Sequence, residues 1–530
     1  MYFGTPMEYR SYYAIYCAII VSLGGFVFGF DASVISGVVS PVTIEFGLTP
    51  IQAGFVVAAP TLSSAIGTLL IGPLSDAFGR KKILMFIALL YLVSAVLSAL
   101  STSYFMLLAA RALGGFAFTS LIIAPMYIAE IAPAQRRGKL VSVNQLNIVI
   151  GLSAAYFANY YILGLSSSGA EWVSAWGIDQ HSWRWMLGFE IGPALIFFTA
   201  LFAIPDSPRW LIQKGREQEA RAVMAKLVPA DQVDSEISLI TQSSATENES
   251  LWARIGGIFG PKMRLALIVG IIVGVVQQIT GINAIFFYAP TIFEQSGIGT
   301  DAAFAQAVLV GLINVIFTLV AIALIDRWGR RPLLLVGLSG IAISMALCTY
   351  GFSQATYELQ TESVAQIQQI ETTEVEQLNS LVGVVYQSDV EFKTAVSDAI
   401  GTEAALRYES ELIKGAAKMN AVLILVGILG FVASFAMSLG PVMWALFSEI
   451  FPNQLRGVAI SFVGMINSMV SFLVQLLFPL ELSVLGATLT FFSYFVFAVI
   501  GLILVAWLLP ETKGKSLEQL ESIFGRKAQG

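Results

Sequence analysis

The residues of this chain that could do chemistry are polar side chains placed inside long apolar runs. Asp31 lies in the first such run, Arg111 lies in the fourth, and Gln277, Gln278 and Asn283 lie close together in the seventh. A charge or an amide inside a lipid-spanning helix is costly and usually faces a cavity or a partner. Amides both donate and accept hydrogen bonds, and a buried acid beside a base can bind and release a proton. These residues therefore indicate reversible binding of a solute and of protons.

The sequence offers little for bond-making chemistry. No nucleophile–base pair, phosphate-binding loop or metal cluster is visible, and the only histidine, His181, stands alone in a loop. The two cysteines, Cys17 and Cys348, sit in apolar runs, which favours inert buried thiols over a disulfide or a metal site. We therefore expect no enzyme activity, no metal and no cofactor. The formal charge of −6 and the lack of a basic stripe argue against a nucleic-acid partner.

The elements that must position these residues are membrane-spanning helices. Of the 530 residues, 56% are hydrophobic and only 12% are charged, whereas a soluble domain carries roughly a quarter charged residues. A helix needs about 20 apolar residues to cross the hydrocarbon of a bilayer. Twelve such runs are present, near residues 12–36, 51–75, 83–101, 104–129, 140–164, 184–205, 265–293, 302–325, 332–353, 419–447, 455–478 and 483–509. The sequence predicts an all-α membrane protein with twelve transmembrane helices.

The distribution of basic residues predicts the orientation of the spans. With a cytoplasmic N-terminus, the great majority of the 29 Lys and Arg residues fall in cytoplasmic segments, as the positive-inside rule requires. We therefore expect a multi-pass protein of the cell membrane with both termini in the cytoplasm.

Two polar segments interrupt the runs and define the predicted domains. Residues 206–261 form a cytoplasmic helical linker between an N-terminal six-helix bundle (1–205) and a C-terminal one (262–509), and residues 510–530 form a cytoplasmic tail. The external segment 354–415 has apolar residues at helical spacing, such as Val364, Ile367 and Ile370. We interpret this insert as amphipathic helices that form an external cap. A solvated spacer without function is the alternative.

Two loop motifs occur once in each half and reveal an internal repeat. Asp76-Ala-Phe-Gly-Arg80 is matched by Asp326-Arg-Trp-Gly-Arg330, and Glu130-Ile-Ala-Pro-Ala-Gln-Arg-Arg137-Gly by Glu449-Ile-Phe-Pro-Asn-Gln-Leu-Arg456-Gly. Parallel six-span repeats build carriers with a substrate site at the midplane between the halves. We predict that these acids and arginines form a cytoplasmic latch between the halves. The alternative is that the basic residues only set the topology.

Further motifs identify a family that the chain resembles. They are Gly25-Phe-Val-Phe-Gly-Phe-Asp31, Arg111-Ala-Leu-Gly-Gly115, Pro125-Met-Tyr-Ile-Ala-Glu130, Pro205-Asp-Ser-Pro-Arg209, Gln277-Gln-Ile-Thr-Gly-Ile-Asn283, Gly440-Pro-Val-Met-Trp444 and Pro510-Glu-Thr-Lys-Gly514. In this order they resemble the sugar porter family of the major facilitator superfamily, and especially its bacterial proton-coupled sugar symporters. The resemblance covers nearly the whole chain. It implies the major facilitator fold and the transport of a monosaccharide or polyol.

The resemblance also implies a sugar site. The positions that match sugar contacts of the family are Gln145, Gln277, Gln278, Asn283, Asn314, Asn467, Trp444, Phe28, Phe287 and Gly440. A sugar needs amides for its hydroxyls and an aromatic platform for its apolar face. The alternative is that these amides only join helices. Ser468, Leu152 and Phe287 depart from residues common in the family, so the sequence leaves the particular sugar open.

Asp31 and Arg111 are the residues expected to couple transport to protons. Burial favours the neutral form of a carboxyl group, and a nearby guanidinium favours the ionised form, so protonation of this acid can follow solvent access. Proton symporters of the family have Asp at this position, whereas animal facilitators commonly have a neutral residue. We expect a carrier that imports sugar by proton symport and alternating access, with sugar, protons and lipid as its partners and a monomer as its state.

Alternatives to this expectation remain. In the first, Asp31 and Arg111 form an ion pair that only orders the helices, and the protein is an uncoupled sugar facilitator. A proton/myo-inositol symporter is a second possibility because animal members of that kind also have a long loop between spans 9 and 10. A sugar sensor or an organic-ion carrier accounts for the sequence less well.

Overall fold

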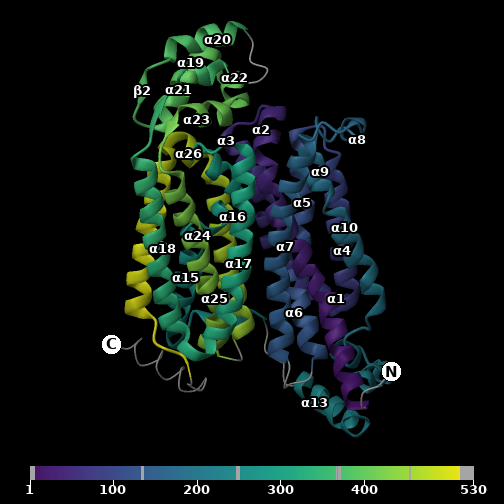
Figure 1. Cartoon of the computed structure of the whole chain (residues 1–530). Coiled ribbons are helices and arrows are strands. Elements are labelled where there is room, and N and C mark those ends of the chain that lie inside the picture. Colours follow the sequence, from purple (N-terminus) through teal and green to yellow (C-terminus); the bar gives the residue numbers. More distant parts are fainter. Residues whose placement is uncertain are drawn as a thin grey trace. The chain divides into compact units, whose positions relative to one another are not determined.

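The computed structural model describes residues 6–132, 137–245, 251–365, 367, 372–452 and 455–513. Helices make up nearly all of this part of the chain (Figure 1). The chain divides into two compact units. Unit 1 comprises Met1–Ser33, Ala59–Ala155 and Arg184–Ala253, and unit 2 comprises Val34–Ala58, Tyr156–Trp183 and Arg254–Gly530.

The helices of the first half run from the N-terminus to the linker. They are α1 (Pro6–Val34), η1 (Ile35–Gly37), α2 (Val39–Phe46), α3 (Pro50–Phe78), α4 (Arg80–Ala99), α5 (Tyr104–Ala117), α6 (Ser120–Ile131), α7 (Arg137–Ser166), α8 (Glu171–Ala175), α9 (Ser182–Gly188), α10 (Ile191–Ala200) and η2 (Leu201–Ala203). Where two of these helices pack closely, glycine allows the approach. A Cβ on Gly29 of α1 would lie 2.0 Å from the carbonyl oxygen of Ile148 on α7. A Cβ on Gly151 of α7 would lie 2.0 Å from the carbonyl oxygen of Phe26 on α1.

The helices of the second half follow the same plan. They are α15 (Arg264–Ile279), α16 (Ile282–Glu294), α17 (Thr300–Trp328), α18 (Arg330–Ser353), α24 (Ala421–Met437), α25 (Leu439–Ile450) and α26 (Arg456–Leu508). Two of these spans are interrupted. The seventh breaks between α15 and α16 at Gly281, whose φ is +94°, and the tenth breaks between α24 and α25 at Ser438. Broken spans commonly line the substrate site of a carrier.

Eleven helical segments in the described residues are long and apolar enough to cross a membrane, and the last of them holds two spans. Helix α26 has 53 residues, so a straight helix would be about 80 Å long, whereas the hydrocarbon core is about 30 Å thick. Gly486 breaks it with φ 74° and ψ 172°. The prediction of twelve spans is confirmed. The break between the last two spans lies at Gly486, whereas the apolar runs in the sequence predict it between residues 478 and 483. Glycine is found here because it adopts this backbone conformation without strain.

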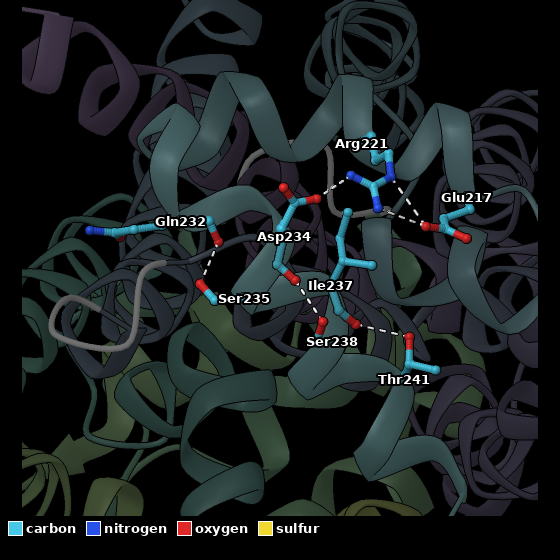
Figure 2. A network of polar contacts seen from close by, with 8 residues as sticks. All are labelled: Glu217, Arg221, Gln232, Asp234, Ser235, Ile237, Ser238 and Thr241. Carbon is cyan, nitrogen blue, oxygen red and sulfur yellow. Dashed lines mark hydrogen bonds and ion pairs between the residues drawn. The ribbon is translucent and has the colours of Figure 1, made fainter.

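The linker after the sixth span is helical. It contains α11 (Pro208–Gln213), α12 (Glu217–Leu227), η3 (Ala230–Gln232), α13 (Val233–Ala245), α14 (Leu251–Ile258) and η4 (Pro261–Met263). Figure 2 shows how Arg221 of α12 pairs with Glu217 on its own helix and with Asp234 of α13. The Trp210 indole N–H of α11 donates to the Asp76 carbonyl at the end of α3, 3.0 Å away. The linker is therefore fastened to the spans of unit 1.

The insert between spans 9 and 10 is a folded subdomain, which we call the cap (residues 354–420). It contains strands β1 (Thr356–Glu358), β2 (Val385–Tyr386) and β3 (Ala417–Lys418) and helices α19 (Thr361–Ala365), α20 (Thr372–Leu378), η5 (Asn379–Leu381), α21 (Asp389–Ile400), α22 (Thr402–Arg407) and α23 (Glu409–Ala416). The strands form an antiparallel sheet in the order β2-β1-β3. The sequence pattern predicts helices alone, and the strands are an addition to it. Buried residues such as Tyr357, Phe392 and Leu412 give the cap a core of its own.

Candidate functional site

Four of the predicted amides form one hydrogen-bonded network in unit 2. Gln277 and Gln278 end α15, and Asn283 follows the break at Gly281 on α16. The Gln278 side-chain N–H donates to the oxygens of Gln277 (3.0 Å) and Asn467 (3.3 Å). Asn467 donates to Gln277 (2.6 Å), and Asn283 donates to Gln278 (2.8 Å). The structure thus brings together amides from spans 7 and 11.

The break at Gly281 places Asn283 in this network. A Cβ at this position would lie 2.7 Å from the ring of Tyr494, and the positive φ disfavours any other residue. Without the break, α15 would continue as a regular helix, in which residues five apart do not lie on one face. The Gln-Gln-Ile-Thr-Gly-Ile-Asn motif therefore combines binding groups with the turn that makes them converge.

Two further residues extend the network and were missed by sequence reasoning. Ser471 accepts hydrogen bonds from Asn283 (2.6 Å) and from Gln475 (2.8 Å), and both Ser471 and Gln475 are buried. They follow Asn467 at spacings of four on α26 and so share its face of the helix. This spacing is the signal that could have found them.

The remaining predicted contacts of unit 2 lie on three neighbouring spans. Asn314 is buried on α17, and Phe287 is half-buried on α16. Gly440 and Trp444 lie on α25, and the exposed Trp444 ring meets Phe447 edge to face with centroids 5.8 Å apart. The Met443 sulfur, also on α25, accepts from Asn467 at 3.8 Å. Span 10 thus contributes to the surroundings of the amides.

The predicted contacts of the first half belong to unit 1. Phe28 on α1 packs edge to face on Phe118, with centroids 4.7 Å apart. Gln145 is half-buried on α7, one residue after the buried Asn144. The close approach of α1 and α7 at Gly29 and Gly151 brings the helices of Phe28 and Gln145 together. A joint site of these two residues with the amides of unit 2 stays a prediction.

Asp31 and Arg111 form a buried ion pair in unit 1, between α1 and α5. The guanidinium contacts Asp31 Oδ1, and both side chains are at most 2% exposed. Gly114, one turn after Arg111, leaves room here, because a Cβ would lie 2.4 Å from Ser94 Oγ and 3.4 Å from Asp31 Oδ2. The pair is therefore held in a compact pocket between helices.

Glu190 is a second buried acid beside this pair, and sequence reasoning missed it. It lies next to α10 in the sixth span, is 2% exposed, and interacts electrostatically with both Asp31 and Arg111. Its Oε1 and Asp31 Oδ2 have no hydrogen-bond partner among the described residues. An acid inside the apolar run 184–205 was the available signal. Unit 1 thus buries a second carboxyl group, whose charge interacts with those of Asp31 and Arg111.

The loop motifs form two equivalent clusters, one within each unit. In unit 1, Arg80 pairs with Asp76 (2.9 Å) and Glu130 (3.1 Å) and donates to the Ser75 carbonyl (3.1 Å). In unit 2, Arg330 pairs with Glu449 (2.7 Å) and donates to the carbonyl of Ile325 (3.1 Å). The internal repeat is therefore visible in individual contacts, and each of these pairs joins residues of a single unit.

The structure describes the side chains of only some of the other residues in the predicted latch. Arg456 Nε donates to the Phe451 carbonyl at 3.2 Å, whereas the side chains of Arg137 and Asp326 lie outside the described residues. Glu511 and Thr512 of the Pro-Glu-Thr-Lys-Gly motif join the second cluster. Glu511 accepts the backbone N–H groups of Arg330 (3.2 Å) and Arg331 (3.0 Å), and Thr512 donates to Glu449 (2.7 Å). Glu511 therefore caps α18 as an anion at a helix N-terminus.

Comparison with known proteins places these motifs in one family. The model of the family described as sugar (and other) transporter matches residues 17–370 and 398–524. The arabinose-proton symporter of Bacillus subtilis is 34% identical over 517 residues, which cover 96% of this chain and 94% of that protein. The D-xylose-proton symporter of Escherichia coli K12 is 32% identical over 555 residues, covering 98% and 97%.

Solved structures give the same result. The inward open conformation of the xylose transporter XylE from E. coli matches with a TM-score of 0.73 and 29% identity, over 96% of this chain and all of that one. A structure of the same major facilitator superfamily symporter bound to 6-bromo-6-deoxy-D-glucose matches with a TM-score of 0.69 and 28% identity, over 97% and 100%.

Proposed function

Because this chain belongs to the family of sugar (and other) transporters and has the major facilitator fold, we propose that it imports a monosaccharide or polyol together with protons. The family consists of membrane transporters and not of enzymes. In the proposed cycle the sugar binds at the midplane, and access alternates between the two sides of the membrane. Both termini and the linker lie in the cytoplasm, and the cap lies outside.

The amide network is the observation that carries the sugar proposal. Gln277, Gln278, Asn283 and Asn467 donate to and accept from one another. Their donors and acceptors are already removed from water, so sugar hydroxyls can exchange for amide partners without a large desolvation penalty. Ser471 and Gln475 continue the same polar face. A ring with several hydroxyl groups suits this alternation of donors and acceptors better than an organic ion does.

Asp31, Arg111 and Glu190 support the proposal of proton coupling. With both acids ionised, the cluster carries one net negative charge away from water, which is costly. One bound proton makes the cluster neutral. We propose that a proton joins Asp31 or Glu190 from outside, that the neutral cluster permits the change of access, and that the proton leaves to the cytoplasm. An uncoupled facilitator would need no such proton.

Uptake into liposomes tests this function. Purified protein is reconstituted and supplied with hexoses, pentoses and inositols in turn, with an acidic outside and a neutral inside. We expect one substrate class to accumulate above its external concentration and to leak out when a protonophore is added. Equilibration without accumulation, in the same liposomes that support counterflow, would assign the protein as a facilitator. Accumulation of inositol alone would favour the proton/myo-inositol symporter.

A further inference from the structure

The cap is fastened to the outer end of the seventh span by three side chains, which we call the clasp. Lys393 Nζ lies 2.7 Å from Gln295 Oε1 and 2.8 Å from Glu409 Oε1, and the Gln295 amide N–H donates to the same Glu409 oxygen at 3.1 Å. Each of the three groups thus contacts the other two. Gln295 directly follows the last residue of α16, whereas Lys393 and Glu409 lie on α21 and α23 of the cap.

The end of the seventh span that the clasp holds is a short segment with breaks on its inner side. Tyr288 has non-helical angles (φ −127°, ψ 20°), and Pro290 follows it. Proline removes a helix hydrogen bond, so a helix can bend at this point. Residues 289–294 form a short helical segment beyond Tyr288, which we call the rod, and the clasp lies at its far end.

Helix α21 connects this rod to a second point on the membrane spans. Asp389 lies four residues before Lys393 and so on the same face of α21. Its Oδ2 accepts the backbone N–H of Ala487 at 3.1 Å, directly after the break at Gly486. A buried acid thus caps the start of the twelfth span, and α21 acts as a strut between spans 7 and 12. The family model does not match residues 371–397, which include Asp389 and Lys393.

The cap also contacts a loop of the first half within unit 2. Helix α22 lies against α2, the short helix that joins spans 1 and 2 (Figure 1). In the same unit, η1 at the end of span 1 packs against α16, and the Tyr156 hydroxyl of span 5 donates to the Phe286 carbonyl. These are contacts of an arrangement that is closed at the cap end. They must separate when this end opens, whereas the clasp joins residues of the second half only.

Space is available beside the clasp. A cavity of about 910 Å³ lies between the cap, α2 and the end of span 7, and its walls include Tyr288, Thr291 and Phe478 as well as the three clasp residues. Thr291 is the residue of the rod that lines this cavity, and the clasp supplies polar contacts on the same side.

We propose that the cap is a lock on the outer gate: Lys393 and Glu409 hold Gln295 so that α22 rests on α2 and the outer side stays closed. This proposal rests on the proposed external location of the cap. A contact biases an equilibrium only if it differs between the two states. The contact of α22 with α2 is the one of these that the cap makes, and the clasp positions the cap to make it. Lys393, Glu409 and Asp389 are thus positioning residues of the transport cycle.

Labelling of one engineered cysteine tests the lock. Ser36 of η1 is 2% exposed and its Oγ has no hydrogen-bond partner among the described residues, so Ser36→Cys disturbs little. A membrane-impermeant thiol reagent added outside reports how often η1 and α16 separate. Protein without Ser36→Cys serves as the blank, because Cys17 and Cys348 are buried. We expect Lys393→Ala to raise the labelling rate by roughly threefold, the scale of a partly exposed ion pair.

Two further variants make the result specific. The exchanged pair Lys393→Glu with Glu409→Lys should return the rate to its starting value, because Gln295 can bond either charge. Lys418→Ala removes an ion pair with Glu358 that joins β3 to β1 of the same cap, away from α22, and should leave the rate unchanged. An unchanged rate in Lys393→Ala, or an increase that the exchanged pair does not reverse, would overturn the lock. Labelling needs neither sugar nor a proton gradient, so it is independent of the transport tests.

Discussion

At the scale of residues, the account depends on a few polar groups inside apolar helices. The amides of spans 7 and 11 satisfy one another, and Asp31, Arg111 and Glu190 share one buried cluster. The amide network supplies groups for hydroxyls, and the charged cluster supplies a place for a proton. Two predictions separate these roles.

The first prediction concerns coupling. Asp31→Asn and Glu190→Gln each remove one of the two buried carboxyl groups that interact electrostatically with Arg111. The cluster then holds at most one negative charge against one positive charge, so no proton is needed for neutrality. We expect both variants to lose sugar accumulation while counterflow continues. Asp31→Asn protein that still concentrates sugar would contradict the assignment, and Glu190→Gln protein that does so would remove Glu190 from it.

The second prediction concerns sugar binding. Gln278→Ala removes an amide that bonds Gln277, Asn467 and Asn283. Loss of a buried hydrogen-bonding group costs about 1–3 kcal/mol, so we expect affinity to fall by roughly tenfold or more. Binding to purified protein measures it, with the exposed Gln213→Ala of the linker as the control. Equal affinities in the two variants would remove Gln278 from the site.

Sequence reasoning found the residues that are rare in apolar runs and missed those in less conspicuous positions. Asp31, Arg111 and the motif amides stand out because a charge or an amide inside a lipid-spanning helix is energetically costly. Glu190 was missed because it lies near the start of its run, and Ser471 because a hydroxyl is unremarkable in a membrane helix. Which of these side chains meet depends on helix packing, which the sequence pattern does not specify.

At the scale of elements, glycines and one acid determine where helices break. Gly281 ends α15 and allows α16 to present Asn283, and Gly486 separates the last two spans with Asp389 as a cap. Hydropathy located the spans because each needs about 20 apolar residues. The strands of the cap escaped prediction because each has only two or three residues, too few for an alternating pattern.

Substitution of Gly281 tests the break. Gly281→Ala forces a Cβ into a left-handed conformation and to within 2.7 Å of Tyr494, with an expected cost of about 1–3 kcal/mol. Gly164→Ala in α7 meets nothing within 4 Å and serves as the matched control. We expect the thermal midpoint in detergent to fall for Gly281→Ala only. Equal midpoints would show that the break is not needed for stability.

The pH dependence of the clasp is a further prediction at this scale. Burial disfavours ionisation of Glu409, but the Lys393 ammonium and the Gln295 amide stabilise the carboxylate, and the pKa of Glu409 lies below its ordinary value of 4.5. Glu294, the residue before Gln295, is an acid that interacts electrostatically with Glu409. A lowered pKa means that the clasp contributes fully above the ordinary value and is lost as pH falls through the lowered one. The lock should therefore persist at the mildly acidic pH that drives uptake.

The ratio of labelling rates checks this sign. The rate for Ser36→Cys with Lys393→Ala is divided by the rate for Ser36→Cys alone at each pH, which cancels the titration of the thiol. We expect a constant ratio from about pH 6 to pH 5 and a fall toward one below about pH 4. A ratio that already falls between about pH 6 and pH 5 would contradict the account of the clasp.

At the scale of the whole molecule, two loop motifs occur once in each half of the chain, and one subdomain, the cap, is inserted in the second half. Arg80 with Glu130 and Arg330 with Glu449 occupy equivalent places in the two halves. The cap has no counterpart in the first half, and its central segment falls outside the family model. The repeat was visible in the sequence because two motifs recur in order. A lock built from the cap was not, because Gln295 is distant in sequence from Lys393 and Glu409.

Sugar-evoked charge movement tests the central claim most directly. Liposomes containing the protein are adsorbed on a capacitive membrane, and the transported sugar is added in sodium-free solution of equal pH on both sides. Proton symport predicts that positive charge enters the liposomes with the sugar and that the current is lost in Asp31→Asn, which keeps counterflow. Counterflow of sugar by the unaltered protein without any charge movement would contradict the account and leave an uncoupled facilitator.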